Sequence, residues 1–252
     1  MESNKPIRKQ RVRKSKKEQQ PTAEIINFYQ LEAVQAFQEP SHNPNYDVHG
    51  IKLPFRMLVI GSSGSGKTNV IVNLIQQMEN TFHNIFIYTR AKGEPLYQFL
   101  ESRIPPEFLK IEEGLDSFNK LDPNKAFDKQ KQTLIVFDDL VLEKDQSKIT
   151  ELFIRGRKLG VSLIYISQSY YRIPITIRGQ STYLILKKIA STRDLTSILR
   201  DSSLGVDKEV LNRIYKYCTQ ELTDFLLIDK ESEQEKIFRH NFDEILDISN
   251  FQ

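Results

Sequence analysis

Residues 61–68 read GSSGSGKT and match the pattern G-x-x-x-x-G-K-[ST] at every position. Glycines let successive backbone N–H groups curl around a phosphate without interference from a Cβ, and a helix that starts there directs its positive end at the same anion. We expect Lys67 to reach the β- and γ-phosphates and the Thr68 hydroxyl to ligate Mg²⁺. The predicted nucleotide-binding residues are Gly61, Ser62, Ser63, Gly64, Ser65, Gly66, Lys67 and Thr68.

An acidic pair follows an apolar run further along the chain. Residues 133–137 (TLIVF) lead directly into Asp138 and Asp139. Carboxylates at the carboxyl end of a buried parallel strand face the nucleotide crevice. We therefore predict that Asp138 holds the metal through water and that Asp139 orients or deprotonates the attacking water. The alternative, a polar loop that happens to begin with two aspartates, is the weaker reading beyond a complete phosphate loop.

Two further motifs were weighed for a role at the nucleotide. The apolar run 161–166 ends in Ser167 and Gln168, and Gln168 is a candidate sensor of the γ-phosphate; the alternative is an ordinary turn residue. Residues 119–122 read NKLD, which matches the base-reading signature of guanine-specific GTPases. This second motif precedes the acidic strand and does not end an apolar strand, so we reject specificity for GTP.

These side chains need a scaffold of alternating strands and helices. Continuous apolar strands joined by amphipathic helices predict an α/β fold with a mainly parallel sheet buried on both faces. We expect a P-loop NTPase three-layer sandwich of the additional-strand (ASCE/RecA-like) type, because run 84–88 falls between the loop strand and the acidic strand. The segment between 88 and 133 is expected to be helix and loop. Expected strands are 57–60, 84–88, 133–137, 161–167 and 183–189. Ser147 is expected to cap a helix that extends to residue 159, and further helices are expected at 193–199 and 207–218, with an apolar run at 225–228.

Composition and charge divide the chain into parts. Its 252 residues are 39% hydrophobic and 27% charged, which is typical of one globular α/β domain with appendages. Residues 1–20 contain eight Lys and Arg against two Glu, a net charge of +6, whereas the remainder sums to −3. We interpret residues 1–22 as a disordered basic tail that contacts nucleic acid or an acidic partner, directs nuclear import, or simply aids solubility. Residues 23–50 are expected to form a helix and linker, 51–230 the P-loop ATPase domain, and 231–252 a C-terminal extension.

Membrane and disulfide signals are weak. The apolar stretches have strand length, well short of the roughly 20 residues that cross a bilayer. The amino terminus lacks the apolar block of a secretory signal, and the single cysteine, Cys218, cannot form an internal disulfide. We expect no membrane span and a reducing intracellular compartment.

Several segments together resemble the FtsK/HerA superfamily, and more narrowly the poxvirus-type genome-packaging ATPases of large eukaryotic DNA viruses and virophages. The resemblance covers about residues 50–230. Beyond the phosphate loop and TLIVFDDL, the discriminating parts are the helix with Arg155 and Arg157, the strand that ends SQS, and IPITIRGQST. Many members of the wider superfamily have glutamate where this chain has Asp139. The poxvirus-type branch resembles this chain in having paired aspartates.

The resemblance implies a ring, hexameric or pentameric, of identical subunits that hydrolyse ATP with Mg²⁺ and draw double-stranded DNA into a preformed capsid. It also implies an arginine from a neighbouring subunit that offsets the charge of the γ-phosphoryl group. Arg178 and Arg157 rank first for this role, with Arg193 behind them. Implied partners are DNA and capsid or portal proteins; the implied location is the cytoplasm or viral factory of the host cell, with the nucleus and the virion as alternatives.

Two other functions fit the phosphate loop. A nucleoside or small-molecule kinase uses the same loop but needs an arginine-rich lid and an acceptor pocket, and the SQS strand argues against it. A nucleotide-dependent assembly switch needs ATP binding but not hydrolysis. ATP turnover with double-stranded DNA or with nucleosides separates the first alternative, and the change Asp139→Asn separates the second.

Overall fold

A computed structural model of the chain describes residues 26–35, 41–128, 130–202 and 204–252. The chain divides into two units, Met1–Glu39 and Pro40–Gln252. The expected basic tail, residues 1–22, lies outside the described residues. In the first unit, the described part contains a 3₁₀ turn η1 (Phe28–Gln30) and a short helix α1 (Glu32–Gln35), separated by Leu31, whose extended backbone ends the 3₁₀ turn. Within residues 26–35, the short helix expected here is thus two brief helical elements.

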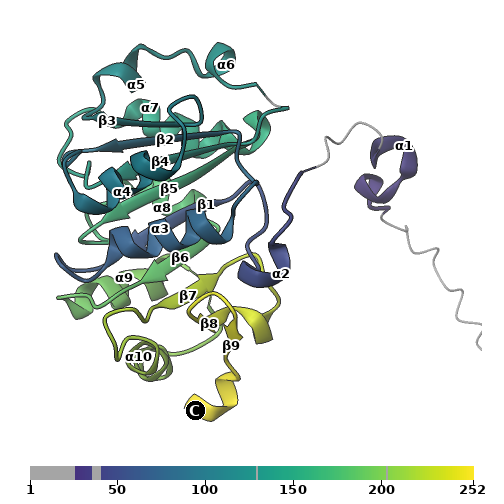
Figure 1. Cartoon of the computed structure of the whole chain (residues 1–252). Coiled ribbons are helices and arrows are strands. Elements are labelled where there is room, and N and C mark those ends of the chain that lie inside the picture. Colours follow the sequence, from purple (N-terminus) through teal and green to yellow (C-terminus); the bar gives the residue numbers. More distant parts are fainter. Residues whose placement is uncertain (1–25, 36–40, 129, 203) are drawn as a thin grey trace, which may run out of the picture. The chain divides into compact units, whose positions relative to one another are not determined.

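The second unit is built on one mixed sheet with the strand order β3-β2-β4-β5-β1-β6-β7-β8-β9 (Figure 1). Strands β1 to β6 are parallel, and β7, β8 and β9 each run antiparallel to the preceding neighbour. All the carboxyl ends of the parallel strands therefore meet at one end of the sheet. The strands are β1 (Arg56–Ile60), β2 (Asn84–Thr89), β3 (Leu109–Glu113), β4 (Thr133–Asp138), β5 (Val161–Ser167), β6 (Tyr183–Leu186), β7 (Leu226–Asp229), β8 (Phe238–His240) and β9 (Glu244–Ile245).

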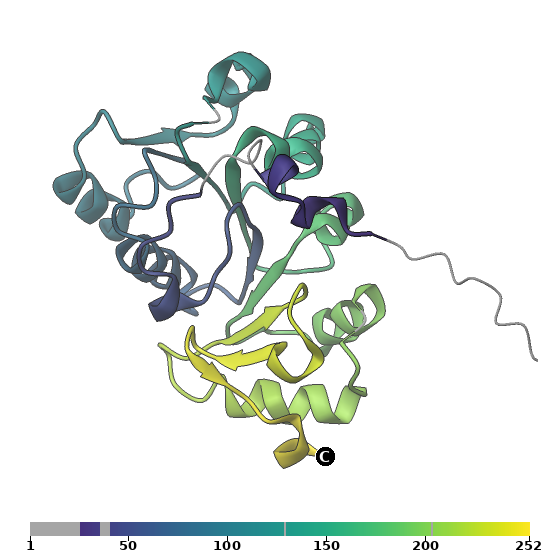
Figure 2. The ribbon, with the colours of Figure 1, turned by 90° about the vertical axis from the view of Figure 1, so that its right-hand side faces the viewer.

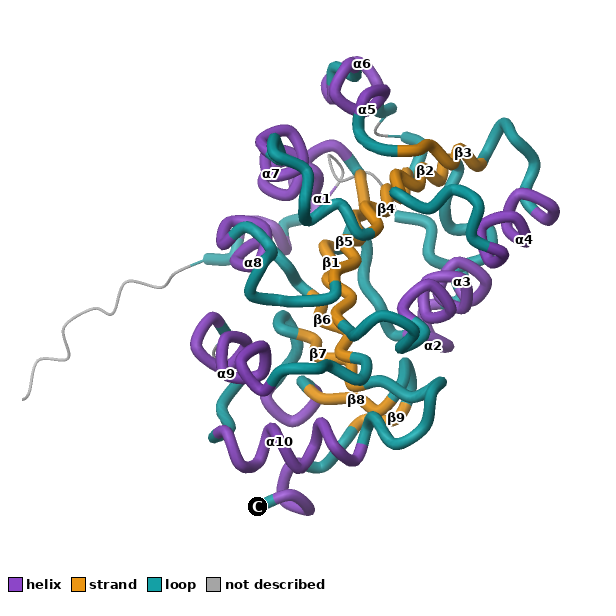
Figure 3. The backbone as a smooth tube through the Cα atoms, turned by 90° about the vertical axis from the view of Figure 1, so that its left-hand side faces the viewer, coloured by secondary structure: helices purple, strands orange, loops and turns teal. Residues whose placement is uncertain are grey.

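Helices cover both faces of this sheet, which gives the three layers expected (Figure 3). One face carries α2 (Tyr46–His49), α3 (Lys67–Gln77) and α4 (Pro95–Arg103). The opposite face carries α7 (Ser147–Arg155), α8 (Ile175–Gln180) and α9 (Thr192–Asp201). The remaining helical segments are α5 (Asp116–Lys120), α6 (Pro123–Ala126), η2 (Gly156–Leu159), α10 (Lys208–Tyr217), η3 (Gln234–Lys236) and η4 (Ile248–Phe251).

The apolar runs become strands because both of their faces are buried. Successive residues of β1 alternate between two cores: Met57 and Val59 pack with α3, whereas Leu58 and Ile60 pack with α7 and α8. Such two-sided burial explains why these strands show no polar alternation in sequence. Ser191 and Asp207 accept backbone hydrogen bonds at the starts of α9 and α10, so side-chain caps set where both predicted helices begin.

The sheet corrects three expectations. The strand inserted between β1 and β4 is β5, whereas β2 lies outside β4; the fold class is as predicted, but the reason from chain order was wrong. The segment between β2 and β4 is not only helix and loop, because it contributes the edge strand β3, whose short alternating run LKIEE has one solvated side. Ser147 is the first residue of helix α7, so the N-cap is Gln146 and not Ser147 as expected.

Residues on both sides of the expected ATPase domain contact it or extend its sheet. Asn45 donates a hydrogen bond from its amide to the carbonyl of Gln77, at 2.9 Å, which ties the segment before residue 51 to α3. The C-terminal residues 231–252 add β8 and β9 to the sheet and lie beside α10, as Figure 2 shows in yellow. Residues 41–252 therefore form one unit in which the C-terminal extension is part of the sheet.

Candidate functional site

The phosphate loop joins the carboxyl end of β1 to the start of α3. Its backbone N–H groups at Gly61 and Ser62 donate to the carbonyls of Ser167 and Lys188, at 3.2 and 2.8 Å, which anchors the loop to the ends of β5 and β6. Gly66 has φ +83°, and a Cβ on Gly61 would stand 2.4 Å from Ser65 Oγ. These two glycines are thus required by backbone conformation and by space, respectively.

Lys67 and Thr68 open α3, and their side chains have different partners. The ammonium Nζ of Lys67 donates to the carbonyls of Gly61 and Ser62, both at 2.9 Å, so the side chain folds over the loop. Burial lowers the pKa of Lys67, while the negative charges of Asp138, Asp139 and Glu94 act to raise it. The buried Ser65 Oγ has no hydrogen-bond partner among the described residues. A glycine-rich loop at a helix start, with an unpartnered buried hydroxyl and an adjacent cation, suits an anion.

Asp138 ends β4 and is buried, as expected for a strand tip. Its Oδ2 accepts hydrogen bonds from the hydroxyls of Tyr97 and Thr89, at 2.6 and 3.2 Å. Burial raises the pKa of Asp138, and these two hydrogen bonds act in the opposite direction. The carboxylate is therefore held in a fixed orientation by residues from β2 and α4.

Asp139 and Gln168 form a pair at the ends of the neighbouring strands β4 and β5. Gln168 Nε2 donates to Asp139 Oδ2 at 3.2 Å. Asp139 has φ +54°, in the left-handed region that few non-glycine residues adopt. Strained backbone of this kind is found mainly at functional sites, which supports a role for Asp139 beyond that of a loop residue.

Four side chains around this site were missed in the sequence. Glu94 precedes α4 and accepts a hydrogen bond at Oε2 from Thr68 Oγ1, at 3.3 Å. Thr89 and Tyr97 hold Asp138, as described above. Lys187 follows β6 and is buried behind the loop, where it donates to the carbonyls of Leu222 and Asp224, at 2.6 and 2.7 Å. Position in the chain could have identified two of these side chains. Thr89 ends β2, which neighbours β4, and Lys187 follows β6, which neighbours β1.

Two of the three candidate arginines lie at the end of the sheet opposite the phosphate loop. Arg157, on η2 before β5, is exposed. Arg178, near the end of α8, is buried, forms an ion pair with Asp201 and lies 5.0 Å over the Tyr170 ring. Both connect to the amino ends of parallel strands, opposite the loop. Arg193 instead begins α9 after β6 and stacks 3.7 Å over the ring of Tyr171.

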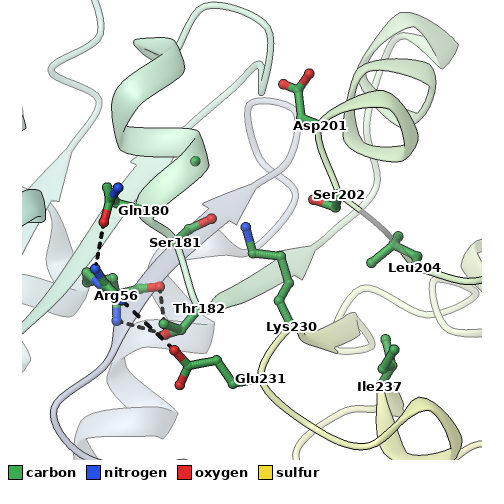
Figure 4. A pocket seen from close by; sticks show the side chains of 11 residues that line it. Arg56, Gln180, Ser181, Thr182, Asp201, Ser202, Leu204, Lys230, Glu231 and Ile237 are labelled. Atoms are coloured by element: carbon green, nitrogen blue, oxygen red, sulfur yellow. Dashed lines mark hydrogen bonds and ion pairs between the residues drawn. The ribbon is translucent and has the colours of Figure 1, made fainter.

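A cavity of about 330 Å³ opens at that opposite end of the sheet (Figure 4). Arg56 and Lys230 line it together with Asp201 and Glu231. Arg56 Nη1 donates to Gln180 Oε1 at 3.0 Å, and Figure 4 shows Lys230 reaching into the space between Ser181 and Ser202. None of the predicted nucleotide-site residues lines this cavity.

The donor set of the loop end fits Mg²⁺. The hydroxyl of Thr68 and the carboxylate of Asp138 are hard oxygen ligands of the kind that Mg²⁺ prefers. Over the described ranges, no group of three or more His, Cys, Asp or Glu side chains is arranged to hold a metal alone. This suits Mg²⁺, which is usually bound by one or two carboxylates together with substrate phosphates.

Comparison with known proteins bears directly on this arrangement. A profile of the family described as "Poxvirus A32 protein" matches residues 48–233, which includes the phosphate loop, the acidic pair and Gln168. The chain belongs to the poxvirus A32 protein family. This membership confirms the predicted resemblance to the poxvirus-type proteins.

Two proteins similar to this A32 family chain are named DNA packaging protein OPG160. The monkeypox virus protein is 28% identical over 208 residues, which cover 75% of this chain and 67% of the relative. The vaccinia virus (strain Copenhagen) protein is 29% identical over 176 residues, which cover 65% and 64%. The matched region thus spans about two thirds of the length of these relatives.

Solved structures support the fold assignment for this A32 family chain. The genome packaging NTPase B204 from Sulfolobus turreted icosahedral virus 2, in complex with sulfate, has a TM-score of 0.55 at 17% identity and covers 76% of this chain and 97% of B204. The complex of B204 with ATP-gammaS has a TM-score of 0.55 at 16% identity. The predicted α/β P-loop NTPase fold is confirmed. No described helix is long and apolar enough to cross a membrane.

Proposed function

We propose that this chain is the ATPase of a viral genome-packaging motor. It hydrolyses ATP at the phosphate loop and couples hydrolysis to the movement of double-stranded DNA into a preformed capsid. The observation that carries the proposal is the convergence of Lys67, Thr68 and Asp138 at one end of the sheet, in a family whose named relatives are DNA packaging proteins.

The chemistry follows from where the charges lie. Phosphoryl transfer spreads negative charge over the γ-phosphate oxygens, and Lys67 and the positive end of α3 offset it. Asp139 orients or deprotonates the attacking water, and Gln168 holds the Asp139 carboxylate by the 3.2 Å hydrogen bond. Thr68 and, through water, Asp138 would hold Mg²⁺, which would supply Lewis-acid neutralisation of phosphate charge.

Subunits of a ring complete one another's sites in this proposal. We favour Arg157 as the residue that reaches a neighbour's γ-phosphate, because it is exposed, whereas Arg178 must first leave its partner Asp201. The test mixes Arg157→Ala subunits with Lys67→Ala subunits. Mixed rings should regain ATP hydrolysis at interfaces that pair an intact loop with an intact arginine; absence of recovery contradicts this assignment.

Partners and location follow from the same proposal. The motor contacts DNA, a second copy of itself, and capsid or portal proteins, and it acts in the cytoplasmic viral factory or with the virion. The basic tail, residues 1–22, supplies phosphate contacts to DNA. Deleting it should weaken DNA binding most at low salt, since phosphate contacts weaken as salt rises.

One measurement tests the central proposal. Purified full-length protein is assayed for ATP hydrolysis with and without double-stranded DNA, with Lys67→Ala as the inactive control, and its oligomeric state is measured with nucleotide and DNA present. DNA should stimulate hydrolysis and higher oligomers should form. A strict monomer that DNA does not stimulate contradicts the motor, and stimulation by nucleosides instead identifies a kinase.

A second variant separates the motor from an assembly switch. Asp139→Asn should retain ATP binding and lose packaging, because it removes the charge beside the attacking water while keeping the shape of the side chain. Unaltered packaging by this variant would show that ATP binding alone is sufficient.

A further inference from the structure

Glu94 lies outside the phosphate loop and the acidic pair, but its side chain contacts Thr68 of the phosphate loop. It immediately precedes α4, and its backbone carbonyl accepts the N–H groups of Tyr97 and Gln98, at 3.0 and 3.1 Å. Residues in this position commonly turn their side chains back to cap their own helix. The Glu94 side chain makes no such bond. Its Oε2 instead accepts the hydroxyl hydrogen of Thr68 at 3.3 Å.

The start of α4 contacts both proposed metal-binding groups, the Thr68 hydroxyl and the Asp138 carboxylate. Glu94 contacts Thr68, and Tyr97, three residues later, donates to Asp138 Oδ2 at 2.6 Å. Tyr97 is fully buried, so the position of this turn is determined by the core. One short helix therefore sets the separation of the Thr68 hydroxyl and the Asp138 carboxylate.

The charges near α4 leave room for a divalent cation. Glu94, Asp138 and Asp139 all act electrostatically on Lys67. Three carboxylates against the ammonium of Lys67 and that of Lys187 behind the loop leave one negative charge, and none of these five groups forms an ion pair within 4.0 Å in the described part of the chain. Such an excess is costly to keep half-buried unless a cation joins it.

We propose that Glu94 is a positioning residue for the divalent cation that enters with the triphosphate. A hydroxyl has one hydrogen and two lone pairs. By accepting the hydrogen of Thr68, Glu94 turns a lone pair of Thr68 toward the cation, and its carboxylate adds negative charge on that side. The inference rests on the proposed nucleotide site and extends it to a residue that neither motif contains.

The test measures how strongly Mg²⁺ and nucleotide help each other to bind. The full-length protein is titrated with N-methylanthraniloyl-ATP in Mg²⁺ and in EDTA, and the ratio of the two dissociation constants is the Mg²⁺-dependent gain. The loss of an outer partner of a metal ligand typically costs 10- to 100-fold in metal affinity. In Glu94→Gln the gain should fall about 10- to 100-fold, while binding in EDTA changes less than about 3-fold.

Two further variants make the result specific. Glu101→Gln removes an exposed carboxylate from the same helix and should keep the full gain. Glu94→Asp keeps the charge on a shorter side chain and should recover part of the gain. If Glu94→Gln does not fold, as judged by thermal unfolding, Glu94→Asp still tests the proposal, because its gain must lie below that of the wild type.

Two outcomes overturn the proposal. An equal loss of affinity in Mg²⁺ and in EDTA would mean that Glu94 only supports the loop. An unchanged gain with slower ATP hydrolysis would mean that Glu94 acts on water and not on the cation. Neither outcome depends on DNA, so a wild-type protein that binds Mg²⁺ and nucleotide without DNA-stimulated hydrolysis contradicts the motor and leaves this assignment standing.

Discussion

The two ends of the central sheet both gather charged side chains, but the charges are matched differently. At the carboxyl end, Lys67 bonds to loop carbonyls, and the carboxylates of Asp138 and Asp139 accept only neutral donors among the described contacts. At the amino end, Arg178 pairs with Asp201, and Arg56 lies 4.0 Å from Glu231. Charges that neutralise one another need no ligand, whereas charges that converge without pairing favour one.

The paired charges at the amino end contribute to stability, whereas the unpaired charges at the carboxyl end are available for chemistry. A buried ion pair mainly holds elements together, and breaking it leaves an uncompensated charge. The charged groups around the phosphate loop are not paired with one another. They are held in place at some cost in stability and are available to a ligand. We therefore expect substitutions at the amino end to change the free energy of unfolding, and substitutions at the carboxyl end to change ATP turnover.

The largest effect is expected at the amino end. Asp201→Ala removes the partner of Arg178, whose side chain is only 7% exposed, and should lower the free energy of unfolding by about 3–5 kcal/mol. Urea unfolding measures it. The matched control Glu151→Ala breaks the surface pair with Arg155 and should cost about 0.5 kcal/mol or less. Equal costs in the two variants would remove the structural role assigned to this end.

Lys67→Ala tests the carboxyl end. Loss of a preorganised charge on the transferred phosphoryl group should reduce ATP turnover by about 10²- to 10³-fold. Stability should fall less than in Asp201→Ala, because the Lys67 ammonium bonds to two loop carbonyls and pairs with no carboxylate within 4.0 Å in the described structure. Lys92→Ala, an exposed lysine near α4, is the control for a nonspecific charge effect. A loss of stability in Lys67→Ala as large as that in Asp201→Ala would contradict the expected difference between the two ends.

A smaller effect is expected for Gln168→Ala. A hydrogen bond to a charged group contributes about 1.5–3 kcal/mol, and 1.4 kcal/mol corresponds to a factor of ten in rate. If Gln168 orients Asp139, kcat should fall about 10- to 100-fold with KM for ATP nearly unchanged. Steady-state kinetics provide the measurement. A rise in KM alone would instead make Gln168 a ground-state contact.

The smallest effect concerns pH and involves one lysine from each end. Burial lowers the pKa of Lys187 and that of Lys230 to about 8, below the usual 10.5. Between these values the unfolded chain binds more protons than the folded one, so each lysine makes stability rise with pH above about 8. Below that pH both states are protonated, and the contribution is constant.

Urea unfolding of wild type, Lys187→Met and Lys230→Met at several pH values from 8 to 9.5 isolates the two contributions. Each variant should lose part of the wild-type increase of stability with pH, whatever its stability at pH 8. Parallel curves for wild type and both variants would contradict the lowered pKa values. Unequal losses would show which end buries its lysine more completely.

Part of the site was predictable because its signals are local. The loop from Gly61 to Thr68 carries its geometry in adjacent residues, and the run before Asp138 must be a buried strand. The strands at β1, β4 and β5 and the capped helices α9 and α10 were found for the same reason. Edge strands were missed, since β3 and the short β8 and β9 have weak apolar runs.

Other features depended on contacts between residues far apart in the chain. Glu94 lies 26 residues from Thr68, and Arg178 lies 23 residues from Asp201. No spacing rule relates these pairs, because the side chains meet only after the strands have been ordered. Chain order also misled the assignment of the inserted strand, which follows β4 in sequence but lies between β1 and β4 in the sheet.

By itself the sequence determined that the protein has a phosphate loop, an acidic strand tip and a layered α/β fold. These depend on backbone conformation and on the burial of neighbouring residues, which short segments encode. Only the tertiary structure decided which charges are neutralised and which remain unpaired, and that α4 brings Glu94 and Tyr97 to the nucleotide site. Such pairings depend on distances between separate elements, and packing of the whole sheet sets those distances.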